Sequence, residues 1–250
     1  MRRSFIAGMM IVLGTAAPLS MVAQPVPPDG AELIRQMHDR YVGKWYRTLS
    51  FTQATQRRTP ADTMVSETWY ETMKLPGRLR IDVGGSPGDP VILYARDSVY
   101  VKRGARLSPG RPGRNPLLIL GFDVYTQPVE RSVGALRDEG FDLKKIHDGS
   151  WQGRRVFIVG ATSGDTVSRQ FWVDAERMVF VRMIGPPAPG QSGAEEVRFD
   201  AYQPAGRGWL STLVTASRGG RLVQKEQYSD VKVDPPVSDD MLDPASLGRP

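Results

Sequence analysis

The sequence predicts a mainly β (α+β) fold, a strongly curved and incompletely closed antiparallel β-barrel with helices lining or covering one side. Strand-like alternation of apolar and polar residues recurs along most of the chain, Gly-, Pro- and Asp-containing turns separate the runs, and few stretches have helical spacing. About ten or eleven strands are expected, and an antiparallel sheet of that size must curl or close. Residues 25–240 are predicted to form a single domain, followed by an irregular tail over 241–250.

The first 24 residues are predicted to be a secretory signal peptide. Arg2 and Arg3 precede an apolar run from Phe5 to about Ala17, which is shorter than the roughly 20 residues of a spanning helix. The alternative is a retained N-terminal anchor. Because the chain has no cysteine, it has neither a thioether-linked lipid nor disulfides. We therefore expect a soluble periplasmic protein, secreted across the inner membrane.

Charge and motif content argue against several functional classes. The 33 basic and 27 acidic residues give 33 − 27 = +6, and the basic residues are scattered without a long run. A nucleic-acid partner is therefore not expected, although weak attraction to an anionic membrane remains open. No nucleotide-binding motif is present, and His38 and His147 lack a second histidine or cysteine at metal-ligand spacing. Neither a cofactor nor a metal is expected.

The stretch from Asp62 to Tyr100 organises the predicted sheet into four strands. Its first strand has apolar residues on one parity and ends at Pro76-Gly77. Residues 78–83 then alternate charged and aliphatic side chains, which is typical of a strand with one wet and one dry face. Strands over 91–95 and 99–101 follow, joined by a short hairpin connection.

The remaining elements are predicted from caps and periodicity. Asp29 is a candidate N-cap for a first helix that ends at Gly43, a short apolar helix begins at Pro116, and a further helix runs from Pro128 to Gly140. Residues 104–114 are predicted to be a surface loop, and Asp148-Gly149 a turn. Further strands are predicted at 45–55, 141–146, 154–161, 167–174, 178–184, 197–202, 209–217 and 222–233.

Three motifs, in their order along the chain, resemble the periplasmic outer-membrane lipoprotein carrier and sorting family (LolA/LolB-like). They are Glu67–Val83 with its Pro-Gly-Arg turn, Asn115–Leu120, and Gln170–Arg177 with its Phe-Trp-Val-Asp sequence. The resemblance implies a monomeric, non-enzymatic carrier or chaperone that holds the acyl chains of lipoproteins or lipids in a hydrophobic hollow. It also implies exchange with an inner-membrane release complex and an outer-membrane acceptor. An arginine on an early strand would latch the lid, and Arg47 and Arg78 are the candidates.

The candidate ligand-binding residues are apolar side chains that the expected register places on the inner face, together with the mid-chain apolar run. They are Trp45, Leu49, Phe51, Val65, Trp69, Met73, Leu79, Ile81, Leu93, Leu117, Leu118, Ile119, Leu120, Phe122, Phe171 and Phe180. On pattern alone a filled core is favoured, because most one-sided sheets are covered by helices. The resemblance favours a hollow instead.

Two other functions remain open at this point. One is an envelope regulatory or sensor module on the same fold that binds a protein partner. The other is a serine hydrolase, because Gly84-Gly85-Ser86-Pro87-Gly88 matches the nucleophile-elbow pattern and His147 lies downstream. The pattern requires a helix directly after Ser86, whereas Pro87, Pro90 and a strand follow, which favours an ordinary loop.

Overall fold

The computed structural model describes residues 25–187 and 189–247. The predicted signal peptide, residues 1–24, lies outside the described residues, as do the last three residues of the predicted tail. No helix among the described residues is long and apolar enough to cross a membrane.

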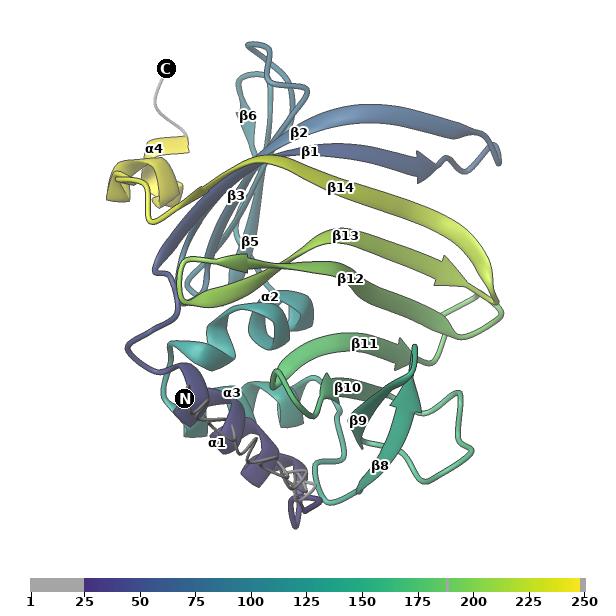
Figure 1. Ribbon diagram of the computed structural model, residues 1–250. Helices are drawn as coiled ribbons and strands as arrows, with labels where there is room; N and C mark the ends of the chain where they lie inside the picture. Colours follow the sequence, from purple (N-terminus) through teal and green to yellow (C-terminus); the bar gives the residue numbers. More distant parts are fainter. Residues whose placement is uncertain (1–24, 188, 248–250) are drawn as a thin grey trace, which may run out of the picture.

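The described residues form one extended sheet and a few short helices (Figure 1). The strands are β1 (Thr48–Arg58), β2 (Met64–Lys74), β3 (Arg78–Val83), β4 (Val91–Ala95), β5 (Ser98–Arg103), β6 (Arg106–Leu107), β7 (Arg111–Pro112), β8 (Ile146–Trp151), β9 (Arg154–Val159), β10 (Gln170–Asp174), β11 (Val179–Gly185), β12 (Glu195–Ala205), β13 (Gly208–Arg218) and β14 (Arg221–Val233). The helices are α1 (Gly30–Tyr41), α2 (Pro116–Gly121), η1 (Asp123–Tyr125), α3 (Val129–Asp138), η2 (Asp239–Leu242) and α4 (Pro244–Leu247).

The sheet is antiparallel at every pairing and remains open. Its strand order is β6-β5-β4-β3-β2-β1-β14-β13-β12-β11-β10-β9-β8, with β7 paired to β5. The long strands β1, β2, β12, β13 and β14 bend through the molecule, so that the sheet wraps around α1, α2 and α3 on one side (Figure 1). The predicted fold class is confirmed. The 14-stranded sheet has more strands than expected, partly because the two-residue strands β6 and β7 lie in the predicted surface loop.

Two predicted strands, 141–146 and 45–55, begin later along the chain than expected. The predicted strand over 141–146 is wrong, since β8 begins at Ile146 and runs through the predicted turn at Asp148-Gly149. Gly149 pairs with Val156, and a Cβ on Gly149 would lie 2.8 Å from Cδ1 of Ile158, so the glycine permits a close approach within a strand. The first strand begins at Thr48 rather than Trp45.

The main core lies between the sheet and α1, α2 and α3. Asp29 caps α1 by accepting a hydrogen bond from the Glu32 N–H at 2.8 Å, as predicted. The apolar face of α1 is completely buried, and the Trp45 ring stacks on Tyr125 of η1 at a centroid distance of 3.8 Å. These contacts fix the first helix against the segment that follows α2.

A second, smaller core lies on the convex face of β3–β5. Leu93 and Ala95 pack there against Leu242 and Leu247 of η2 and α4. The prediction of an irregular tail is therefore wrong for residues 241–247, because two apolar side chains give this segment a surface to pack on. The tail lies outside the sheet, on the side away from α1 (Figure 1).

Two helical glycines test how tightly α1 is packed. A Cβ on Gly30 would lie 2.6 Å from Cγ1 of Val159 and 3.2 Å from the Leu143 carbonyl oxygen. We expect Gly30→Ala to lower the free energy of unfolding, measured with urea, by about 1–3 kcal/mol through overpacking.

The matched control is Gly134→Ala in α3, where a Cβ would have no neighbour within 4 Å. This change should raise the free energy of unfolding by up to about 1 kcal/mol, because alanine loses less backbone entropy in a helix. A Gly30→Ala protein as stable as the wild type would show that α1 does not contact β9 this closely.

Candidate functional site

The candidate site is the half of the concave sheet face that the helices leave uncovered. Register pairs on this face join Leu49 to Met73, Phe51 to Glu71 and Gln53 to Trp69 across β1 and β2. The inward positions thus change from apolar, beneath the helices, to mixed polar and apolar toward the open end.

Most of the predicted lining residues fill the core instead of facing a hollow. They are buried, at most 8 % exposed, and belong to one packed cluster: Trp45, Leu49, Phe51, Met73, Leu79, Ile81, Leu118, Ile119, Leu120, Phe122, Phe171 and Phe180. The space beneath α1, α2 and α3 is therefore occupied by the chain's own side chains. The filled-core interpretation applies to this half of the sheet.

The predicted lining residue Leu93 lies on the opposite face. Leu93 pairs with Arg80, whereas Ile92 and Tyr94 pair with Ile81 and Leu79 and share their inward face. The expected register for β4 was shifted by one residue, which exchanges the two faces of a strand. Leu93 is covered by the C-terminal helices and has no access to the concave side.

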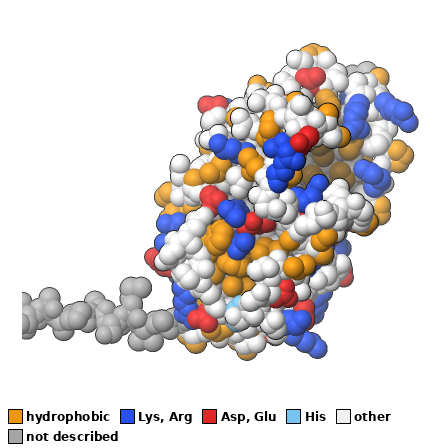
Figure 2. Space-filling view, turned by 90° about the vertical axis from the view of Figure 1, so that its right-hand side faces the viewer, with side chains coloured by type: hydrophobic (Ala, Val, Ile, Leu, Met, Phe, Trp, Pro, Cys, Tyr) orange, Lys and Arg blue, Asp and Glu red, His pale blue; other side chains and the backbone are white. Residues whose placement is uncertain are grey.

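The open half carries apolar side chains that are half buried and contact the core on one side. Val65, Trp69 and Leu117 from the predicted set are partly exposed. The partly buried apolar residues on this face that pack against the core are Trp69, Val83, Ile92, Tyr94, Leu117, Met183, Val197 and Tyr228. Figure 2 shows a recess on this side of the molecule, with hydrophobic side chains in it and lysine and arginine side chains around it.

Polar residues occupy the floor of this face, which the sequence analysis missed. Gln53 and Thr55 are buried and hydrogen-bonded to each other at 2.7 Å. Glu71 is 6 % exposed, and burial together with the nearby Glu226 raises its pKa well above the usual range. A signal was present, because Glu67 and Glu71 share the parity of Trp69 and Met73.

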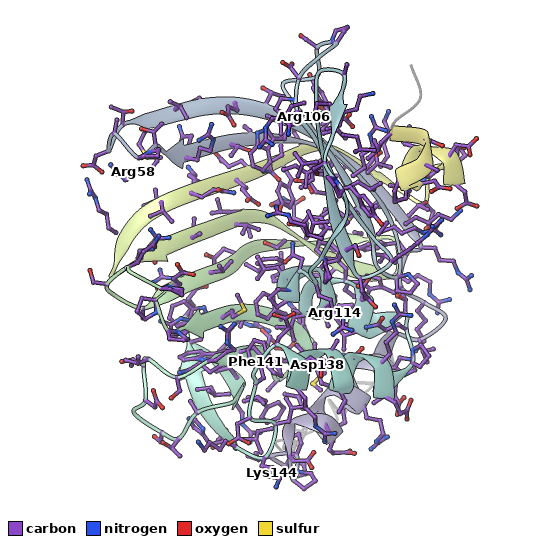
Figure 3. The ribbon with its side chains drawn as sticks, turned by 180° about the vertical axis from the view of Figure 1, so that it is seen from behind. Arg58, Arg106, Arg114, Asp138, Phe141 and Lys144 are labelled. Atoms are coloured by element: carbon purple, nitrogen blue, oxygen red, sulfur yellow. The ribbon has the colours of Figure 1, made fainter. Side chains whose placement is uncertain are left out.

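The segment carrying α2 is held at both ends by polar contacts. Arg114 pairs with Asp138 at the end of α3 at 2.8 Å and with Asp97 in the β4–β5 turn at 3.4 Å (Figure 3). Asp123 of η1 accepts a hydrogen bond from the Gly77 N–H at 2.9 Å. A cavity of about 110 Å³ is bordered by Gly77, Asp97, Arg114 and Asp123. Burial raises the pKa of Asp123 to about 7, so this tie responds to pH.

The two predicted latch arginines do not contact α2. Arg47 is exposed, and its backbone N–H donates to Asp234 at 2.7 Å. Arg78 pairs with Asp239 of η2 at 2.6 Å, on the convex side. Outward parity on β3 explains the position of Arg78. Arg114 and Asp123 instead make the polar contacts at the two ends of the α2 segment. Neither residue was distinguishable in the sequence from other loop and helix-end residues.

Ser86 does not form a hydrolase site with the predicted base. It lies in the exposed β3–β4 loop, where its N–H donates to Asp89 at 2.8 Å and no helix follows. His147 is on β8, at the other edge of the sheet. The loop borders an open cavity of about 650 Å³ that reaches Arg80, Lys102 and Leu247. Among the described residues, no group of histidine and carboxylate side chains could hold a metal ion.

Structural comparison relates this fold to known proteins. It is similar to a DUF1329 family protein from Desulfovibrio piger, with a TM-score of 0.59 and 11 % identity over 87 % of this chain and 97 % of that chain. It is also similar to a putative outer membrane lipoprotein-sorting protein domain from Vibrio parahaemolyticus, with a TM-score of 0.57, 11 % identity and coverage of 86 % and 97 %. A LolA superfamily protein from Nitrosomonas europaea gives a TM-score of 0.52, 12 % identity and coverage of 85 % and 97 %.

No family model matches the chain, and no curated protein sequence matches it. The likeness at these identities concerns the fold, and at that level the resemblance to LolA-like proteins is confirmed.

The pH response of Asp123 provides a test of how the α2 segment is held. Between the ordinary pKa of 3.8 and about 7, the folded state binds a proton that the unfolded state releases. The free energy of unfolding therefore falls as pH rises through this window, by up to about 1.4 kcal/mol per pH unit for one such group. Asp123→Asn keeps an acceptor for Gly77 and should make this decline shallower in urea unfolding.

The decline should not vanish in Asp123→Asn, because the raised pKa values of Glu71 and Glu226 act in the same direction. Asp138→Asn, which removes an exposed carboxylate, is the control and should keep the wild-type slope. An unchanged slope in Asp123→Asn would mean that the pKa of Asp123 is not raised in the folded protein.

Proposed function

We propose that this protein is a periplasmic, non-enzymatic binder and carrier of acylated cargo, a lipid or lipoprotein, whose acyl chains lie in the open half of the concave face. The fold shared with a lipoprotein-sorting domain and a LolA superfamily protein supports the proposal. The periplasmic location rests on the signal peptide predicted for residues 1–24.

The observation that carries the proposal is the set of half-buried apolar side chains on a concave surface. Trp69, Leu117 and Val197 each contact the core on one side and remain partly exposed on the other. Covering such surface with an acyl chain contributes about 0.8 kcal/mol per buried methylene group. A two-chain lipid would therefore bind without many polar contacts.

The α2 segment provides a route to a larger binding surface. Leu118, Ile119 and Leu120 are buried against the core, so moving α2 would expose apolar surface that acyl chains could replace. Such an exchange requires that the ligand binds the open state better than the closed state. Hand-over to a membrane acceptor would then follow from a difference in affinity. The ties at Arg114 and Asp123 would set how easily α2 moves.

Quenching of Trp69 tests whether an acyl chain occupies the concave face. Bromine atoms on a fatty chain quench tryptophan emission at short range, so dibromostearate should reduce the fluorescence of the wild-type protein on titration. Trp69→Phe should lose most of that quenching, because Trp69 lies on the proposed binding surface.

The control is Trp172→Phe. The Trp172 ring contacts the guanidinium of Arg182 at 4.3 Å, and its register partner Arg182 lies on the face opposite Phe171. This variant should retain quenching of its remaining tryptophans by the bound chain. Equal quenching in Trp69→Phe and the wild type would place the chain elsewhere and overturn the proposed site.

A further inference from the structure

The floor of the concave face contains buried polar side chains, and one of their oxygens has no hydrogen-bond partner among the described residues. Glu71 is buried, with 6 % of its surface exposed. Within the described residues no hydrogen bond or ion pair reaches its carboxyl group. The Oε1 atom of Gln53 is also buried without a partner. A buried acceptor without a donor costs about 1–3 kcal/mol, so the Gln53 oxygen needs an explanation.

A second carboxyl group lies close to Glu71. Glu71 on β2 pairs with Phe51, and Glu226 on β14 pairs with Thr55, so that the two glutamates flank the inward face of β1 on either side of Gln53. Their interaction is strong enough that Glu226 contributes to the raised pKa of Glu71. The two glutamates and Gln53 thus share the inward face of three neighbouring strands, with the Gln53 oxygen fully buried.

Three side chains on this part of the face donate hydrogen bonds to neighbouring groups other than Glu71 and the Gln53 oxygen. Gln53 Nε2 donates to Thr55, while Gln224 Nε2 and the Tyr228 hydroxyl donate to Glu226. The guanidinium of Arg57 is paired with Glu67.

The hydroxyl of Tyr94 lies near enough for Glu71 to raise the pKa of Tyr94, yet it donates no hydrogen bond to Glu71 within the described residues. Among the described residues no lysine or arginine forms an ion pair with Glu71 or Glu226, and burial is the main cause of their raised pKa values. No hydrogen bond among the described residues reaches the Glu71 carboxyl group or the Gln53 oxygen, so a ligand that carries donors would complete the cluster.

We propose that the concave face binds an amphiphile with a cationic amine head group, which lies between Glu71 and Glu226 while its acyl chain covers the half-buried apolar residues. This inference rests on the proposed function and deepens it by naming the chemistry of the head group. An ammonium group supplies three donors and one positive charge, which match the carboxyl group of Glu71 and its neighbour Glu226.

The test compares head groups on a constant chain. Dodecylamine, dodecanoate and dodecanol, each below its critical micelle concentration, are titrated into the full mature chain, with binding measured by calorimetry at pH 7. We expect dodecylamine to bind about tenfold or more tightly than dodecanoate, because a charged hydrogen bond in a partly desolvated site favours the cation. Butylamine, which has the same head group on a short chain, should bind far more weakly.

The variants separate the head-group contact from the chain contact. Glu71→Gln combined with Glu226→Gln should remove the preference for dodecylamine over dodecanoate while leaving the affinity for dodecanol close to the wild-type value. Glu67→Gln is the matched control, because Glu67 shares the strand and face of Glu71 but is already paired with Arg57 and Trp69. It should keep the wild-type preference. Thermal unfolding confirms that each variant is folded.

A wild-type protein that binds the three long-chain probes equally, or prefers dodecanoate, overturns the head-group inference while the proposed function stands. If butylamine binds as tightly as dodecylamine, the site binds short amines without an acyl chain, and the inference that the ligand is an amphiphile is overturned. If none of the long-chain probes binds, the proposed function fails and the inference fails with it.

Discussion

The structure depends on the curvature of one antiparallel sheet that is too wide for its helices to cover. The sheet runs from β6 to β8 without closing, so it has two faces along its whole width and needs apolar cover on the concave one. Helices α1, α2 and α3 cover part of that face and bury the residues beneath them nearly completely. What remains is a concave surface whose side chains contact the core on one side and are partly exposed on the other.

The same constraint explains why the site is not a preformed cavity beneath the helices. Twelve of the residues that the sequence placed in a ligand hollow pack against one another and against α2, so this part of the protein is a filled core. A ligand gains apolar contact either on the open half of the face or by displacing α2. The polar ties at Arg114 and Asp123 hold α2 in place and connect its position to pH through the raised pKa of Asp123.

Acidic residues on the concave face distinguish it from a purely apolar groove. Glu71 and Glu226 lie on strands that flank β1, and among the described residues neither forms an ion pair with a basic side chain. Placing uncompensated carboxyl groups where water is scarce costs folding free energy, and a native sequence keeps such groups where a ligand or a switch uses them. The convex face handles its charges differently, since Arg78 and Lys74 there both pair with Asp239 and fasten the C-terminal segment to the sheet.

The sequence by itself determined the fold class, the antiparallel order of short strands and turns, the cap of α1 at Asp29 and the start of α2 at Pro116, because periodicity and these local signals depend on neighbouring residues. Tertiary structure decided which parity faces inward on β4, where Leu93 lies on the convex side, and that Gly149 continues a strand. It also decided that Leu118 and Phe180 fill a core while Trp69 stays half exposed. Alternation along a strand specifies that two faces differ, but the register with neighbouring strands and the reach of the helices determine which face is covered and how completely.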